Sequence, residues 1–361
     1  MFYYIVKSLV GYVSAVNVFR YITIRSAYAL ITALLISFIF GPMIIRFLRK
    51  IKFSHIRDYV PEAHQLKTGT PSMGGLLIIL SVVVATALWG DISSPYVILP
   101  LIVVVWLGAL GFLDDYLKIT KKNPEGVIAR YKIIAQAVLG LAVGFYLYYF
   151  PYDEQLRASI TVPFLKYYFF NMGWLYIPFV MLVIIGASNA VNLTDGLDGL
   201  AIGNIGVAIM AFAAIAYVSG HKNFADYLNI PFLSGTGELT VFCLAIVGAA
   251  LGFLWFNAYP AAVFMGDTGS MALGGGLGVI AVLLKREILL LIIGGVFVIE
   301  ALSVILQVLY FKATKGKRLF LLAPLHHHFE KLGWSEAKVT VRFWIMGIML
   351  ALLGLSTLKL Q

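Results

Sequence analysis

The sequence predicts an all-α integral membrane protein with ten transmembrane helices, and three observations carry this prediction. Of the 361 residues, 61% are hydrophobic and only 12% are charged, against about 45–50% and about 25% in an average soluble domain. Ten stretches hold about 20 mostly apolar residues each, the length that crosses a bilayer as a helix. The gaps between them are short, so residues 1–361 are expected to form a single polytopic membrane domain.

The predicted spans are nearly uncharged runs separated by polar or basic segments. The first 25 residues are not expected to be a cleaved signal peptide, because Lys7 interrupts the apolar stretch and no A-x-A cleavage site follows. The fifth span ends in a polar motif that begins at Asn189. In chain order the spans cover residues 26–46, 73–90, 96–113, 132–150, 174–191, 199–218, 238–256, 269–284, 287–310 and 340–358.

Basic residues orient these spans. Ten spans place both termini on one side of the membrane and five loops on the other, and those loops with their flanks hold 18 of the 27 Lys and Arg residues. Cytoplasmic loops carry the excess of basic residues, so both termini are predicted to be periplasmic. The five cytoplasmic loops are residues 47–72, 114–131, 192–198, 257–268 and 311–339.

The net charge of +10 follows from this placement. On a soluble protein it would suggest nucleic acid. Here the positive charge orients the spans and attracts anionic lipid headgroups and polyanionic substrates, so no nucleic-acid partner is expected. The single cysteine, Cys243, lies in an apolar run and leaves no intramolecular disulfide.

Four unusual polar clusters fall at span ends on the predicted cytoplasmic side. A miscount of one span midway would divide them between the two faces. Their convergence predicts one site at the cytoplasmic membrane surface. The clusters are Asp114-Asp115, Asn192/Asp195/Asp198, Asp267 and His326-His327-His328.

The first cluster ends the third span with two adjacent carboxylates, Asp114 and Asp115. Adjacent residues on a helix point about 100° apart, so the two acids are expected to have different roles. Acids beside lysines at a membrane surface suit Mg²⁺, which takes one or two carboxylates plus phosphate oxygens. The alternative is a solvated helix end in which Lys118 pairs with the acids. Lys118 also stands where a D-D-x-x-D prenyl-diphosphate motif has its third Asp.

The second cluster places Asn192, Asp195 and Asp198 at i, i+3 and i+6. If this segment is helical, the three form one polar stripe. Gly196 and Gly199 beside them would let a ligand approach the backbone. The alternative is a cap on the sixth span.

The third cluster sets Asp267 at the expected start of the eighth span, where free amides and the helix dipole favour anions such as phosphate. Asp267 would act there as a metal ligand, or alternatively as a simple N-cap. Asn257 and Phe264 lie upstream. An amide and an aromatic face are what a nucleobase needs for edge recognition and stacking.

The fourth cluster puts three histidines in a basic loop. Histidine binds phosphate when protonated, transfers protons or ligates metal, but a zinc site would require spaced ligands, so anion binding is preferred to a plain solvated loop. Glu300 lies midway in the ninth span, with Ser303 and Gln307 as the nearest polar groups on its helix face. It is either functional or a protonated structural residue.

Together, carboxylates, cations and a helix N-terminus describe phosphoryl transfer, which depends mainly on positioning and charge neutralisation. A site at headgroup level suggests one lipid substrate and one soluble anionic substrate. No P-loop or G-x-G-x-x-G fingerprint is present. The small-residue pairs Gly140/Gly144, Gly199/Gly203 and Gly248/Gly252 and the run Gly274–Gly276 are interpreted as helix packing.

Five motifs spread over most of the chain carry a family resemblance: KTGTPSMGG (67–75), LGFLDDY (110–116), NAVNLTDGLDGLA (189–201), FMGDTGSMALGG (264–275) and APLHHHFEKLGW (323–334). The chain resembles the polyprenyl-phosphate N-acetylhexosamine-1-phosphate transferase superfamily and, within it, the phospho-N-acetylmuramoyl-pentapeptide transferases. The histidine loop separates this branch from siblings that handle other sugars.

The resemblance implies a multi-pass enzyme of the bacterial inner membrane. It would move phospho-MurNAc-pentapeptide from UDP-MurNAc-pentapeptide to undecaprenyl phosphate, giving lipid I and UMP. It would use Mg²⁺, with Asp267 as principal ligand and Asp115 as a candidate second. The catalytic residues by motif match are Asp114, Asp115, Asp267 and His326. The substrate-binding residues are Lys67, Lys132, Asn192, Asp195, Asp198, Asn257, Phe264, His327 and His328. Whether the chain forms a homodimer stays open.

Two mechanisms compete. An aspartate could form a covalent phospho-sugar enzyme, or the lipid phosphate could attack directly. A phosphomonoester has a second pKa near ~6, whereas an ordinary Asp lies near ~3.9 and is a weak base for it. Direct attack is therefore the hypothesis, with Asp114 serving position and charge.

Three other functions are weighed. A sibling transferase would use UDP-GlcNAc and differ in the last cytoplasmic loop. An intramembrane prenyltransferase would carry a second aspartate-rich motif like the one at Asp114-Asp115. A proton-coupled transporter would set its acids at the bilayer midplane, often within inverted repeats, whereas here they lie at one surface.

Overall fold

The structure, a computed structural model, describes residues 2–4, 14–50, 69–120, 126–163 and 169–360 and is nearly all-α, as predicted. The long helices are α2 (Ile22–Lys50), α4 (Gly75–Trp89), α5 (Pro95–Thr120), α6 (Ala129–Tyr149), α7 (Tyr176–Thr194), α8 (Leu200–Ser219), α10 (Gly237–Asn257), α11 (Gly266–Leu283), α13 (Gly295–Ala313) and α15 (Glu336–Ser356). Shorter helices are α9 (Lys222–Leu228), α12 (Glu287–Ile293), α14 (Leu325–Lys331), η1 (Ser14–Arg20), η2 (Glu154–Leu156), η3 (Gly173–Leu175) and η4 (Thr357–Leu360).

Every predicted span except the ninth coincides with one of the long helices. Within the described ranges, nine helices are long and apolar enough to cross a membrane, which confirms a multi-pass membrane protein. The tenth apolar helix, α4, has 15 residues, or about 22 Å at ~1.5 Å per residue, which is short of the ~30 Å hydrocarbon core. Ten crossings and periplasmic termini therefore remain predictions.

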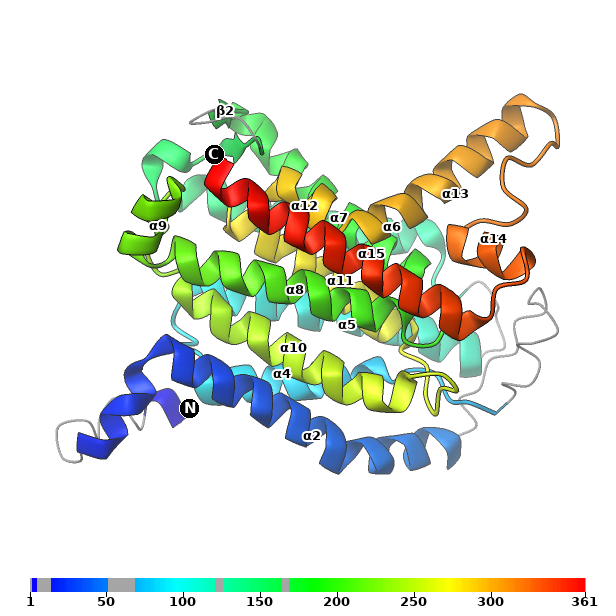
Figure 1. The fold of residues 1–361 in the computed structure, drawn as a ribbon, viewed down its shortest axis with the longest axis horizontal. Coiled ribbons are helices and arrows are strands. Elements are labelled where there is room, and N and C mark those ends of the chain that lie inside the picture. Colours follow the sequence, from blue (N-terminus) through cyan, green and yellow to red (C-terminus); the bar gives the residue numbers. More distant parts are fainter. Residues whose placement is uncertain (1, 5–13, 51–68, 121–125, 164–168, 361) are drawn as a thin grey trace.

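Two local features differ from the sequence expectation. The ninth span is not one helix: α12 ends before Gly294 and α13 begins at Gly295. Glycine is a poor helix former, and Figure 1 shows α13 leaning out of the bundle beyond this break. Between α6 and α7, β1 (Ser159–Thr161) pairs antiparallel with β2 (Phe169–Asn171) in a small hairpin.

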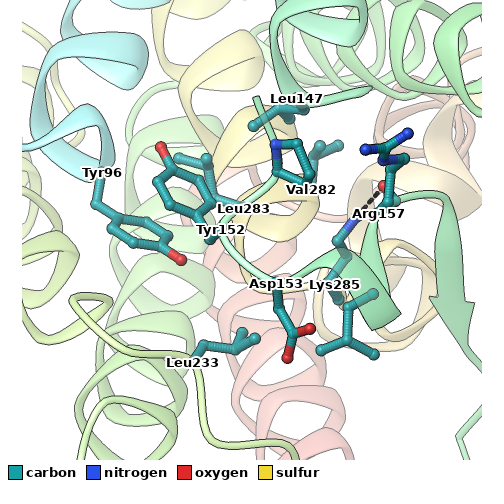
Figure 2. Close-up of a pocket in the computed structure, with 11 residues that line it drawn as sticks. Tyr96, Leu147, Tyr152, Asp153, Arg157, Leu233, Val282, Leu283 and Lys285 are labelled. Atoms are coloured by element: carbon teal, nitrogen blue, oxygen red, sulfur yellow. Dashed lines mark hydrogen bonds between the residues drawn. The ribbon is translucent and has the colours of Figure 1, made fainter. Parts of the chain in front are cut away.

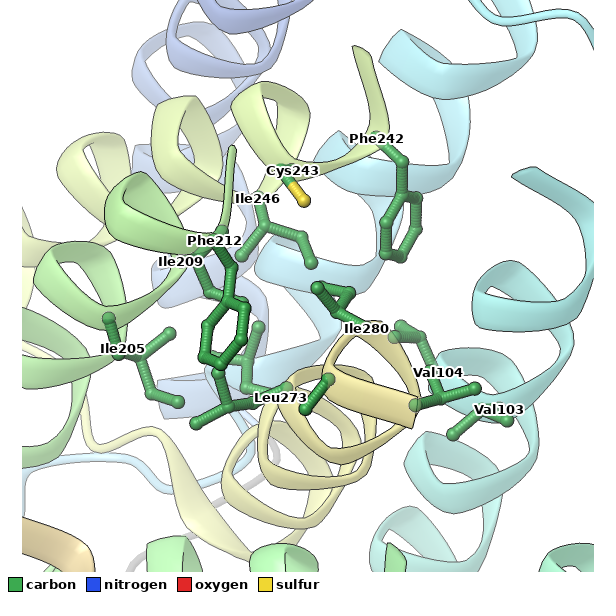
Figure 3. Packing of buried hydrophobic residues seen from close by; sticks show 14 of the residues in the cluster. Val103, Val104, Ile205, Ile209, Phe212, Phe242, Cys243, Ile246, Leu273 and Ile280 are labelled. Atoms are coloured by element: carbon green, nitrogen blue, oxygen red, sulfur yellow. The ribbon is translucent and has the colours of Figure 1, made fainter. Parts of the chain in front are cut away.

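Helix α11 is the centre of the bundle, and every residue from Asp267 to Leu283 is buried. Its glycines allow neighbouring helices to approach: a Cβ on Gly275 would lie 2.0 Å from Leu107 Cδ1 of α5. Figure 3 shows Leu273 and Ile280 of α11 beside apolar side chains of α8, α10 and α5. Those labelled neighbours are Val103, Val104, Ile205, Ile209, Phe212, Phe242, Cys243 and Ile246.

The small-residue pairs act in packing, as interpreted. A Cβ on Gly144 of α6 would lie 2.7 Å from Ile177 O of α7, and one on Gly248 of α10 would lie 2.1 Å from Leu30 O of α2. These close approaches confirm that the glycines serve helix contact.

The two ends of the bundle differ. Figure 1 shows η1 and the C-terminal end of α15 at one end, and the C-terminal ends of α2, α10 and α13 at the other. Close to the termini, Lys285 Nζ donates a hydrogen bond to Arg157 O (3.1 Å; Figure 2), and burial lowers the pKa of Lys285 to about 8. The rings of Tyr96 and Tyr152 stack there with centroids 4.2 Å apart. The cavity between these side chains holds about 20 Å³, which has room for one water and not for a larger ligand.

Candidate active site

Four helices bring polar side chains together at the end of the bundle away from the termini. Asp114 and Asp115 come from α5, Lys132 from α6, Asn192 from α7 and Asp267 from α11. The three aspartates offer carboxylate oxygens that all lie within 4.8 Å of one another, and all three residues are buried. The acids predicted from separate motifs therefore form one cluster.

Asp115 binds the N-terminus of α11. Its carboxylate accepts hydrogen bonds from Asp267 N (3.2 Å), Thr268 N (3.0 Å) and Thr268 Oγ1 (2.7 Å). A negative charge is favourable at this position because of the free amides and the helix dipole. These amides were expected to hold a substrate phosphate, and the anion that they contact in the structure is Asp115.

Asp267 is not an N-cap. Helix α11 begins at Gly266, one residue before Asp267, and the preceding Met265 makes no side-chain cap. Since Asp115 supplies the cap from another helix, both oxygens of Asp267 point to other partners. The N-cap alternative is thus wrong for this residue.

Two glycines make the contact between α5 and α11 close enough for this arrangement. A Cβ on Gly111 would lie 2.2 Å from Asp267 O. Gly266 has φ +74°, and a Cβ there would lie 2.6 Å from Asp115 Oδ2. Any larger residue at either position would separate the carboxylates.

Asp114 and Asp267 share two ammonium groups. Lys118 Nζ lies 2.6 Å from Asp114 Oδ2 and 2.9 Å from Asp267 Oδ2. Lys132 Nζ lies 2.8 Å and 3.1 Å from the same two oxygens. Asp114 Oδ1 also accepts a hydrogen bond from Val127 N (2.7 Å).

The two adjacent acids therefore have different partners, as the angle between neighbouring helical residues predicts. Asp114 pairs with the lysines and Asp115 with a helix N-terminus. Asp114 is 0% exposed, so a solvated helix end is wrong. Lys118 was assigned only as an ion-pair partner, although its i+4 position from Asp114 could have placed it in the site.

The expected polar stripe is only partly formed. Asn192 Nδ2 donates to Asp267 Oδ1 (2.8 Å) and to Ser270 Oγ (2.9 Å). Helix α7 then ends at Thr194, because the glycines that follow break the helix, and Asp195 and Asp198 lie in the turn before α8. The i, i+3, i+6 spacing does not continue on one helical face.

Asp198 contacts a different loop. It is buried, and its Oδ2 accepts a hydrogen bond from Ala261 N (2.9 Å), while its own N donates to Glu336 Oε1 (2.7 Å). It thus joins the α7–α8 turn to the segment between α10 and α11 and to the start of α15.

Asn257 and Phe264 flank that same segment. Asn257 is buried, accepts a hydrogen bond from Gly199 N (3.1 Å) and donates one to Val263 O (2.9 Å). Phe264 is half-buried, and its N donates to Pro71 O (2.8 Å). Residues 69–75 of the first motif thus lie beside the start of α11, and Lys67 lies outside the described residues.

The three histidines of α14 have three different surroundings. His326 is buried against Glu300 of α13, with Nδ1 3.1 Å from Oε2. His327 Nδ1 lies 2.7 Å from Glu330 Oε2. His328 Nδ1 accepts a backbone N–H from the loop before α14. Glu300 was noted in the sequence without its partner.

The aspartate cluster fits a divalent cation. Three carboxylates supply only oxygen atoms, the donors that Mg²⁺ prefers, and Mg²⁺ uses one or two carboxylates while substrate phosphates complete its shell. Asp115 accepts three hydrogen bonds from the first turn of α11, whereas Asp267 is contacted by the side chains of Asn192, Lys118 and Lys132. Side chains can move aside for a cation more easily than a helix terminus, so Asp267 could hold the metal.

Comparison with known proteins supports the same chemistry. The family model described as glycosyl transferase family 4 matches residues 97–285, which include all three aspartates of the cluster. A phospho-N-acetylmuramoyl-pentapeptide-transferase of Thermodesulfovibrio yellowstonii is 53% identical over the full length of both chains. Proteins of the same name from Solidesulfovibrio magneticus and Maridesulfovibrio salexigens are 53% and 52% identical, again over both full lengths. The chain belongs to the phospho-N-acetylmuramoyl-pentapeptide-transferase family.

Proposed function

We propose that this protein transfers phospho-MurNAc-pentapeptide from UDP-MurNAc-pentapeptide to undecaprenyl phosphate, releasing UMP. The observation that carries the proposal is the buried cluster in which two lysine ammoniums contact Asp114 and Asp267. Such a group of acids and cations suits a diphosphate with its metal. Full-length relatives of this name favour this reaction over transfer of GlcNAc-1-phosphate, prenyl transfer or proton-coupled transport.

Mg²⁺ would be held by Asp267, with Asp115 as a second candidate, and would neutralise and orient the diphosphate. Lys132 would neutralise phosphate charge together with Lys118, as would Lys67. The nucleotide-sugar would be held by the α7–α8 turn, by the segment between α10 and α11 and by α14. The residues assigned to it are Asn192, Asp195, Asp198, Asn257, Phe264, His326, His327 and His328.

The favoured mechanism is direct attack. An oxygen of undecaprenyl phosphate forms a bond to the sugar-bearing phosphorus, and the bond from that phosphorus to the UMP oxygen breaks, leaving the electron pair on UMP. Asp114 would position the lysines and balance their charge, which its two ion pairs support. One diphosphate bond replaces another, so the equilibrium constant should be near one.

We place this site at the cytoplasmic face of the bacterial inner membrane. The support is the excess of Lys and Arg in the loops at the predicted cytoplasmic side. Labelling of single cysteines introduced at positions 333 and 221, with Cys243 replaced by Ser, tests this: only position 221 should react with an impermeant thiol reagent in intact cells.

The direct test of function is UMP release by the purified protein. Release should require UDP-MurNAc-pentapeptide, undecaprenyl phosphate and Mg²⁺ together, and UDP-GlcNAc run in parallel should give none. If UMP is released with UDP-GlcNAc but not with UDP-MurNAc-pentapeptide, the protein is instead a GlcNAc-1-phosphate transferase. A phospho-sugar adduct trapped on any aspartate would rule out direct attack.

A further inference from the structure

A buried carboxylate holds the first histidine of α14 at two points. Glu300 and His326 are both 0% exposed. Glu300 Oε1 accepts a hydrogen bond from His326 N (3.2 Å), and Glu300 Oε2 lies 3.1 Å from His326 Nδ1. The carboxylate comes from the second turn of α13 and the histidine from the start of α14, so both the backbone and the ring of His326 are fixed from another helix.

This contact determines which ring nitrogen carries the proton. With the Glu300 carboxylate ionised, Oε2 only accepts hydrogen bonds, and the Nδ1 atom 3.1 Å from it is then the donor. In a neutral imidazole the other nitrogen then keeps its lone pair. Nε2 of His326 is therefore a hydrogen-bond acceptor.

That acceptor is buried and has no hydrogen-bond partner. It faces Gly196 in the turn between α7 and α8, where a Cβ would lie only 2.2 Å from Nε2. A buried polar atom without a partner is unfavourable. The turn that it faces also carries Asp195 and Asp198, which the proposed function assigns to the nucleotide-sugar.

We propose that Glu300 is a positioning residue for the transfer: it fixes the ring and tautomer of His326, so that Nε2 accepts a hydrogen bond from an N–H or O–H group of the nucleotide-sugar once the turn at Gly196 moves away from it. The proposal rests on the proposed function. Carboxylates play this orienting role behind histidines in other sites, where they fix the tautomer without contacting substrate. Glu300 would thus act only through His326.

Kinetics of variants test this coupling. Loss of a hydrogen bond that depends on the orientation of His326 should raise the KM for UDP-MurNAc-pentapeptide by about 10- to 100-fold in Glu300→Ala. The KM for undecaprenyl phosphate and the Mg²⁺ dependence should change little. In a His326→Ala background, the Glu300→Ala change should add no further effect, because residues that act as a unit are not additive. Additive effects would overturn the proposal.

The conservative variant Glu300→Gln separates orientation from packing. Glutamine has nearly the same shape, but its amide can donate to Nδ1 and so move the ring proton to Nε2, which converts the acceptor into a donor. The KM should therefore rise almost as much as in Glu300→Ala. Restoration of the wild-type KM by glutamine would assign Glu300 a packing role only and refute the inference.

Ser303→Ala is the matched control, because Ser303 is also buried in α13 but donates only to the backbone carbonyl of Glu300 (2.6 Å). Its KM should match wild type. The ¹⁵N spectrum of the imidazole rings gives a readout that needs no turnover: His326, identified by the His326→Ala variant, should carry its proton on Nδ1 in the wild type and on Nε2 in Glu300→Gln. A proton on Nε2 in the wild type would contradict the inference, even if the transferase activity is established. Conversely, a protein without transferase activity would still show the proton on Nδ1 if Glu300 orients His326.

Discussion

The hydrogen bonds of Asp115 lead to a quantitative prediction for Asp115→Asn. The wild-type carboxylate accepts three hydrogen bonds from the first turn of α11. An asparagine keeps one accepting oxygen. If that oxygen takes the place of Oδ2, it retains both contacts to Thr268, and the new NH₂ group then faces Asp267 N–H, donor against donor. At least one buried donor loses its partner.

The magnitude follows from these losses. A buried donor without a partner costs about 1–3 kcal/mol, and removal of a charge from a helix N-terminus adds about 0.3–1 kcal/mol or more. The expected destabilisation is therefore about 1–4 kcal/mol. At roughly 2–3 °C per kcal/mol, the apparent Tm should fall by roughly 2–12 °C.

The assay is thermal unfolding of detergent-solubilised protein at one fixed scan rate, with Asp114→Asn as the matched control. Asp114 is the neighbouring acid, but it contacts two lysines and Val127 rather than α11. The apparent Tm of Asp114→Asn should fall by less than that of Asp115→Asn. If the order is reversed, the division of roles between the two acids is refuted.

Four further predictions concern the site. Asp114→Asn should retain a larger share of wild-type activity at pH 8–9 than at pH 6.5, because the lipid phosphate is dianionic above its second pKa of ~6; uniform inactivity across this range would count against direct attack. Chelation with EDTA should abolish UMP release and added Mg²⁺ should restore it, and activity that persists in EDTA would exclude a metal role. Gly266→Ala should be destabilised by about 1–3 kcal/mol and lose activity, whereas Gly333→Ala, also at positive φ but with open space around it, should stay active; equal losses would point to backbone strain alone. Lys132→Met should lower kcat/KM for UDP-MurNAc-pentapeptide by more than tenfold with little change in Tm, and unchanged kinetics would remove Lys132 from the site.

Hydropathy predicted the helices well because lipid imposes one simple requirement on every span. The break at Gly294 could not be predicted in this way, since a glycine pair inside an apolar run leaves its hydropathy high. Strands β1 and β2 have three residues each, too few to produce a recognisable alternation. The end of α7 was missed because the i, i+3, i+6 spacing takes no account of glycines that break a helix.

The site was predicted from topology more than from local pattern. Counting spans placed the acids on one face, and the structure brings Asp114, Asp115 and Asp267 together. The contact of Asp115 with α11 joins residues 152 positions apart, and it depends on helix packing at Gly111 that no local pattern reports. Glu300 likewise could not be assigned a partner, because His326 lies 26 residues further along and in another helix.

The complete burial of α11 has a consequence for the membrane environment of the enzyme. Helices that face lipid tilt or bend when the bilayer is thinner or thicker than their apolar length. Helix α11 is shielded from lipid by its neighbours along its whole length from Asp267 to Leu283, so such adjustments fall on the outer helices. Among these, α2 and α13 have only 28% and 22% of their apolar membrane-crossing window buried inside the protein. The carboxylate of Asp267 is therefore carried on the part of the protein that is best insulated from changes in bilayer thickness.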